Sequence, residues 1–241
     1  MIPHDEERDR DVVKWAGRMA FAFVGAILPL VVPAANNQVW LKQSAEVPVV
    51  DLWEGGRFAV LVEQEEKFGE RGFINSESLA MAELELCRFA TLRLGDRFVY
   101  ERSRGRGALV PEHRPTFDVD LTTPELLTLK LDFRTRFEWR MIEGETAYMR
   151  YRERVRLRTD WSVTRWKFSP FVSEEFFFSD KSDYDASDVF DRSRAQVGFS
   201  FLPVPSMPEL VCRPYFMVQH DFDPSGWDPI NVYGLELSCR F

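Results

Sequence analysis

The sequence is poor in the residues on which many catalytic and metal sites depend. Its 241 residues include only 3 Cys and 3 His, and no two cysteines form a CxxC pair. Three cysteines are too few for a disulfide framework, and the lack of CxxC argues against thiolate zinc sites and dithiol redox centres. Neither a glycine-rich phosphate-binding loop nor a GxSxG motif occurs. We therefore expect no cofactor, no metal site and no catalytic residue.

The chain also lacks the positive charge that is typical of nucleic-acid-binding proteins. Its net charge is −8 at pH 7, so we expect no nucleic-acid partner. Aromatic residues are abundant instead, with 21 Phe, 7 Trp and 6 Tyr. So much apolar surface argues against an intrinsically disordered chain, and the length suits a single domain.

The first 35 residues have the composition of a secretory signal. Residues 1–18 are charged, and residues 19–35 are apolar and end in small side chains after Pro33. A membrane-spanning helix needs about 20 apolar residues, more than this run offers. We therefore interpret residues 1–35 as a cleavable signal peptide, followed by one domain over residues 36–241. The acidic residues near the start are unusual in a signal peptide, and translation from Met19 would explain them. An N-terminal membrane anchor is the alternative.

After residue 35 the dominant pattern is alternation of apolar and polar residues, which is typical of β-strands with two unlike faces. In residues 127–141 every odd position except Thr135 is apolar, and every even position is polar. Residues 148–158 carry arginine at every even position from Arg150 onward. The residues between these two segments include Gly144 and predict a tight hairpin.

Similar segments recur along the whole chain, and none shows the spacing of an amphipathic helix. The predicted strands cover residues 38–47, 57–67, 78–90, 96–104, 113–121, 127–141, 148–158, 165–179, 189–202, 210–220 and 230–241. The fold class is therefore all-β, and the short connections predict an antiparallel up-and-down barrel. Bacterial single-chain barrels have an even number of strands, so we expect about twelve strands, with about ten as the alternative.

Alternation alone is compatible with two kinds of barrel. In a soluble barrel the apolar faces form the core, whereas in a transmembrane barrel they face lipid and the polar faces point inward. Strands in soluble domains average about 5–6 residues, and several of the segments here are at least twice as long. The chain also ends in alternating apolar residues and a terminal Phe, an arrangement that looks like the assembly signal of outer-membrane barrels. The residues of this predicted signal are Tyr233, Leu235, Leu237 and Phe241.

The alternating segments resemble a known family. The resemblance rests on residues 133–141, 149–159, 168–178 and 190–201, together with Glu112-His113-Arg114-Pro115. It is to a family of small outer-membrane β-barrel proteins of Gram-negative bacteria, which form a domain of unknown function. The resemblance implies a barrel in the bacterial outer membrane, with outer-membrane lipid and the barrel assembly machinery as partners. It implies no activity, and the acidic N-terminus and the irregular segment 90–110 depart from the family pattern.

In the membrane interpretation the polar faces line the interior of the barrel. The predicted interior charges are Arg134, Arg136, Glu138, Arg140, Arg150, Arg152, Arg154, Arg156, Glu175, Arg192 and Arg194. Unpaired buried charges are costly, so these arginines must meet carboxylates or water. A closed network of ion pairs is the leading interpretation.

Three further functions stay open on the sequence alone. A cationic interior predicts a narrow channel that prefers small anions. His220 beside Asp221 is the one lead toward a lipid-modifying enzyme, although no serine motif supports it. A soluble periplasmic β-protein is the last alternative, and in it the same arginines would face solvent.

Overall fold

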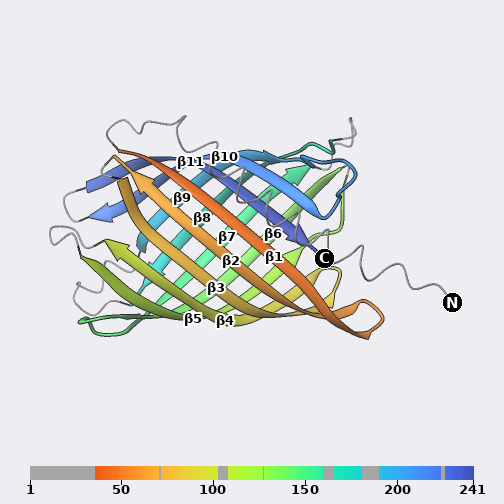
Figure 1. Cartoon of the computed structure of the whole chain (residues 1–241), viewed down its shortest axis with the longest axis horizontal. Coiled ribbons are helices and arrows are strands. Elements are labelled where there is room, and N and C mark those ends of the chain that lie inside the picture. The colour runs from red at the N-terminus through yellow and green to blue at the C-terminus, as the bar shows by residue number, and fades with distance from the viewer. Residues whose placement is uncertain are drawn as a thin grey trace.

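The computed structural model describes residues 36–241 except 71, 103–107, 127, 160–165, 181–189 and 224–225. In this part of the chain eleven strands close into one barrel. Figure 1 shows the barrel from the side. The same residues contain no helix, and so none that is long and apolar enough to cross a membrane. The predicted signal peptide, residues 1–35, lies outside the described residues.

The strands occur at the places where the alternation predicts them, and most are longer than predicted. They are β1 (Asn37–Trp53), β2 (Gly56–Gly69), β3 (Gly72–Cys87), β4 (Ala90–Arg102), β5 (Leu109–Thr122), β6 (Leu129–Ile142), β7 (Tyr148–Thr159), β8 (Ser169–Ser179), β9 (Phe190–Ser200), β10 (Leu210–Asp223) and β11 (Gly226–Arg240). Each pairs with its sequence neighbours, and β1 pairs with β11 to complete the ring. The all-β barrel architecture predicted from the sequence is confirmed.

The two faces of each strand differ in burial, and β6 shows this most clearly. Its apolar residues Phe133, Phe137 and Trp139 are 38%, 39% and 44% exposed on the outside of the barrel. Its charged residues Arg136 and Glu138 are only 3% and 0% exposed. Because successive side chains of a strand point to opposite faces, this strand turns its apolar face outward and its charged face inward.

The strand number and the closure differ from the expectation. The described residues form eleven strands instead of about twelve, and β1 and β11 pair in parallel, from Asn37 opposite Asn231 to Glu46 opposite Arg240. Hairpins reverse the chain at every step, so with an odd number of strands the last strand runs in the same direction as the first. The prediction of an even, wholly antiparallel barrel was wrong at this β1–β11 seam. The other neighbouring strands are antiparallel.

An apolar cluster lies inside the barrel beside the seam. Trp40, Met217 and Val232 are buried there, and Tyr215 packs against them. Gly234 lies opposite Trp40 on β1 and opposite Tyr215 on β10. A Cβ atom at Gly234 would come within 1.9 Å of the Tyr215 ring, so only glycine lets the ring lie across this strand.

The parallel seam makes a specific prediction about crosslinking. Ala45 on β1 lies opposite Cys239 on β11, and paired Cα atoms of neighbouring strands are about 4.8 Å apart, within reach of a disulfide. We expect the Ala45→Cys variant to form a disulfide with Cys239 under mild oxidation, measured as a mobility change in a non-reducing denaturing gel. The other two cysteines, Cys87 and Cys212, are replaced by serine in this experiment.

The control moves the new cysteine by two residues along the same face of β1. Gln43 lies opposite Leu237, which places its Cα too far from Cys239 for a disulfide. We expect Gln43→Cys to stay reduced. Equal crosslinking of both variants, or crosslinking of the Gln43 variant alone, would contradict the parallel register.

Candidate functional site

A cavity of about 1060 Å³ occupies one half of the barrel interior. It begins at the end of the barrel where Asn37 and Gly72 lie and extends to Lys42, Arg156 and Glu236 near the middle. None of its described lining residues comes from the opposite end, where the turns after β1 and β3 lie. The described walls therefore form a pocket that opens at one end.

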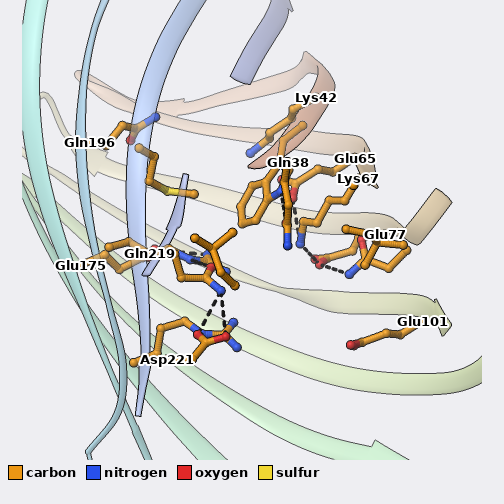
Figure 2. A pocket seen from close by; sticks show the side chains of 18 of the residues that line it. Gln38, Lys42, Glu65, Lys67, Glu77, Glu101, Glu175, Gln196, Gln219 and Asp221 are labelled. Atoms are coloured by element: carbon orange, nitrogen blue, oxygen red, sulfur yellow. Dashed lines mark hydrogen bonds and ion pairs between the residues drawn. The ribbon is translucent and has the colours of Figure 1, made fainter. Parts of the chain in front are cut away.

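The cavity wall is rich in basic residues. Fourteen Lys and Arg side chains line it, against seven Asp and Glu. The whole chain has a net charge of −8, so the sign of the charge in the cavity is opposite to that of the protein. Figure 2 shows side chains that line different sides of the cavity, with Lys67 near Glu77 on one side and Gln219 near Asp221 on another.

Buried carboxylates behind the wall neutralise many of these arginines. Glu138 is 0% exposed and accepts hydrogen bonds from Arg150 Nε and Arg152 Nη1, both at 2.7 Å. Asp118 on β5, also 0% exposed, accepts from Arg136 through Nε and Nη2 at 2.6 and 2.5 Å. Two parallel bonds of this kind combine charge with fixed geometry, which makes the pair a rigid crosslink between β5 and β6.

A second acidic centre on β8 serves arginines from three strands. Glu175 accepts from Arg134 Nη2 at 2.9 Å and from Arg152 Nη2 at 3.0 Å. The Arg194 guanidinium lies 3.8 Å from its other oxygen. The single negative charge of Glu175 is thus shared by three cations, so it cannot also neutralise a fourth.

The facing wall, formed by β2 to β5, is also organised by carboxylates. Glu77 on β3 accepts from Lys67 on β2 and from Arg97 on β4, the latter at 2.5 Å. Glu112 accepts from Arg114 through Nε and Nη2, at 2.6 Å each. The Glu77 pairs join β2, β3 and β4 on the inside, in addition to the backbone ladder, whereas Glu112 and Arg114 belong to the same strand, β5.

More ion pairs occupy the end of the barrel opposite the cavity mouth. Arg93 donates to Glu83 at 2.6 Å between β4 and β3. Glu46 accepts from Arg57 at 2.7 Å and from Arg240 at 2.6 Å, which links β1 to β2 and, across the seam, to β11. Ion-paired side chains therefore lie in the interior where the cavity ends.

Two arginines on β7 differ from all these. Within the described residues neither Arg154 nor Arg156 has a carboxylate within 4.0 Å. The Nε of each is buried without a hydrogen-bond partner, as it also is in the paired Arg134 and Arg152, so the missing carboxylate is what sets these two arginines apart. Both line the cavity. The Arg156 guanidinium lies over the Phe171 ring, 4.8 Å from its centroid. Their charges are thus available to a molecule in the cavity.

The structure brings the arginines predicted for the interior together. The predicted residues that line the cavity are Arg134, Arg136, Arg140, Arg150, Arg152, Arg154, Arg156, Glu175, Arg192 and Arg194. Glu138 lies behind this wall, fully buried against Arg150 and Arg152.

Sequence reasoning missed much of the facing wall. Lys67, Glu77, Arg97, Glu112 and Asp118 were not among the predicted interior charges. Alternation is weak in β2 and β4, which hides the inward positions there. The residues around Asp118 do alternate between apolar and polar, and this pattern could have identified Asp118 as an inward-facing charge.

The structure separates the side chains of His220 and Asp221, the two residues that suggested a lipid-modifying enzyme. His220 and Asp221 are consecutive residues of β10, so their side chains point to opposite faces of the barrel. Asp221 lines the cavity and accepts from Arg192 Nε at 2.5 Å. All three cysteines are free, and the described part of the chain contains no group of three or more His, Cys, Asp or Glu that could hold a metal ion.

Comparison with known proteins places this barrel in a family. Residues 37–228 match the family model described as a protein of unknown function, DUF2490. The chain belongs to the DUF2490 family. The match confirms the resemblance of the alternating segments to a barrel family without a known activity.

No curated protein sequence matches this DUF2490 chain. Among solved structures it is similar to "LpxR from Salmonella typhimurium", with a TM-score of 0.42 and 11% sequence identity. The similarity covers 77% of this chain and 83% of that one.

The ion-pair network predicts opposite effects for two arginines of the same wall. In Arg136→Gln the fully buried Asp118 loses its bidentate partner, so we expect the barrel to lose about 3–5 kcal/mol of stability. In Arg154→Gln no ion pair is lost and like-charge repulsion with Arg134 is relieved, so we expect equal or higher stability. The measurement is the urea midpoint of the folded barrel in detergent micelles or lipid vesicles. A large loss of stability in the Arg154 variant would show that this residue has a structural partner.

Proposed function

We propose that this DUF2490 protein is a non-enzymatic outer-membrane β-barrel whose interior is closed by ion pairs and holds a cationic pocket. The observation that carries the proposal is the combination of an exposed apolar outer face with a buried charged interior. A soluble β-barrel has the reverse arrangement. The predicted signal peptide over residues 1–35 agrees with export from the cytoplasm.

The outer face is apolar on many strands around the ring. Large exposed hydrophobic side chains include Val60, Leu94, Phe98, Leu121, Phe137, Leu157, Val172, Val197, Phe199 and Tyr233. Soluble monomers rarely expose contiguous apolar patches larger than a few hundred Å². A ring of such residues is favourable only where lipid surrounds it, which makes outer-membrane lipid a partner of the protein.

The residues predicted to form an assembly signal belong to β11 or follow it directly, at the seam with β1. Tyr233, Leu235 and Leu237 precede the terminal Phe241, whose side chain is 41% exposed. The backbone N–H of Phe241 donates to the Glu46 carbonyl at 3.0 Å, so the terminus continues the seam between β11 and β1. In this proposal the barrel assembly machinery recognises the terminal residues before the seam closes.

The ion pairs at one end of the barrel favour a closed interior over a channel. The cavity stops near the middle of the barrel, and Glu46, Glu83, Arg57, Arg93 and Arg240 form ion pairs beyond it. The excess of basic residues in the wall favours the second candidate, a narrow channel for small anions. Rearrangement of the ion pairs at the closed end would be needed for conduction.

The membrane location is tested by cell fractionation together with gel mobility. We expect the protein in the outer-membrane fraction of the producing bacterium, with a band that migrates differently before and after boiling. Folded transmembrane barrels keep their shape in detergent until they are heated, which is the physical reason for the shift. A periplasmic band without a heat-dependent shift would contradict the proposal.

Conductance separates the closed barrel from the channel. We expect purified wild-type protein in planar bilayers to give no steady current, because ion pairs fill one end of the interior. The variant Arg57→Ala removes a side chain from the closed end and leaves the cavity wall intact. If removal of one ion pair opens the barrel, we expect current from this variant and none from the wild type. Steady anion-selective current from the wild type that weakens in Arg152→Glu would favour the channel.

A further inference from the structure

We propose that the inner end of the cavity is a binding site for the phosphate group of a small soluble molecule, formed by Arg154 and Arg156 of β7 with Arg134 of β6. The site requires the barrel interior as described and does not depend on the membrane location proposed above. The ligand of this cationic pocket is then a compact anion with two negative charges and several acceptor oxygens.

The three arginines converge because of the strand register. Arg154 and Arg156 are two residues apart on one strand, so both point into the barrel. Arg134 lies directly opposite Arg154 in the β6–β7 pairing. All three line the cavity.

The carboxylates that lie beside these arginines are already engaged. Glu175 is the register partner of Arg154 on β8, but it binds Arg134, Arg152 and Arg194 instead. In the next row, Asp132 on β6 lies opposite Arg156.

Asp132 is also engaged. It accepts from Arg158 Nε at 2.8 Å. On the β8 side Arg156 faces the neutral Ser173, which is followed in the same row by Gln196. The row therefore supplies no carboxylate that is free to neutralise Arg156.

Such an arrangement of like charges without nearby carboxylates has an energetic cost. Like charges that face each other across two strands destabilise a sheet, and buried ionic groups without partners are expensive. A side chain that served only the structure would be replaced by a neutral one with a gain in stability. The excess charge is therefore best explained by an anion that completes the network when it binds.

Phosphate matches the chemistry of the site better than a single carboxylate does. Guanidinium groups present planar pairs of N–H donors that suit phosphate oxygens, and two or three of them together match a dianion. The Phe171 ring beneath Arg156 restricts the plane of that guanidinium. Gln196 also lines the cavity and offers a neutral amide to the rest of the ligand.

The shape of the cavity favours a small soluble ligand over a lipid. Its volume of about 1060 Å³ is at the upper end of ordinary small-molecule sites, and it opens at one end of the barrel. Charged and polar side chains make up most of the cavity wall, so an acyl chain on a ligand bound there would meet little apolar surface. A phosphomonoester such as glycerol 3-phosphate fits these constraints, whereas a lipid headgroup offers the same phosphate with unsuitable tails.

Calorimetric titration of the purified full-length protein in detergent micelles tests the site, with inorganic phosphate and glycerol 3-phosphate as probes. We expect saturable binding that weakens as salt increases. Loss of one charge-assisted contact should weaken binding at least about tenfold, so we expect this loss in Arg154→Gln and again in Arg156→Gln.

Arg57→Gln is the matched control. It removes the same charge, but Arg57 is paired with Glu46 at the opposite end of the barrel and lies outside the cavity wall. We expect the phosphate affinity of this variant to equal that of the wild type. An equal loss of phosphate affinity in all three variants would show that the effect comes from the general loss of positive charge, and it would overturn the site. Heat-shifted gel bands establish that each variant is folded before titration.

A vesicle experiment distinguishes the two sources of phosphate. We expect phosphatidic acid vesicles to leave the binding of glycerol 3-phosphate unchanged. Binding to phosphatidic acid vesicles that depends on Arg154, without binding of the soluble probes, would overturn the assignment to a small solute. Absence of binding to every probe would overturn the site itself, while outer-membrane fractionation would continue to test the barrel independently.

Discussion

The pairing of buried arginines with buried carboxylates is the interaction on which the whole barrel depends. Apart from the small cluster around Trp40, most large apolar side chains face outward, so they cannot form the core that holds most small domains together. Charged side chains take their place inside, as Asp118 with Arg136 and Glu138 with Arg150 and Arg152 illustrate. Removing charge from water is expensive, and only close, well-aligned partners offset that cost. The network thus fixes which strands can be neighbours and in what register.

The same constraint separates structural arginines from available ones. Carboxylates in the interior are fewer than cations, and Glu175 already serves three arginines. Among the described residues that line the cavity, Arg154 and Arg156 are left without a carboxylate partner, and they lie at its inner end, away from the ion pairs at the opposite end of the barrel. Stability and binding are therefore assigned to different arginines of one wall, which is why substitutions at Arg136 of β6 and Arg154 of β7 are expected to act in opposite directions.

Much of the fold was predictable from the sequence, and the reasons are physical. Alternation over residues 127–158 identified two strands and their inward faces, because a shift of one residue would exchange the two faces. The alternation also indicated eleven segments, and the expectation of an even strand number wrongly raised this count to about twelve. The parallel seam between β1 and β11 was not predictable, since it joins residues far apart in sequence. Which arginine is paired also depends on register across strands. Arg152 and Arg154 look alike in the sequence, yet only Arg152 contacts Glu138 and Glu175.

The most direct test of this account is the environment of the outer face of one strand. Spin labels at Phe133, Phe137 and Trp139 of β6, introduced one at a time through cysteine, report collisions with lipid-soluble oxygen in reconstituted vesicles. The account predicts high oxygen accessibility at all three positions, and a label at the inward-facing Gln196 should respond to a water-soluble relaxation agent instead. Labels at the three β6 positions that are shielded from oxygen and packed inside the protein would contradict it.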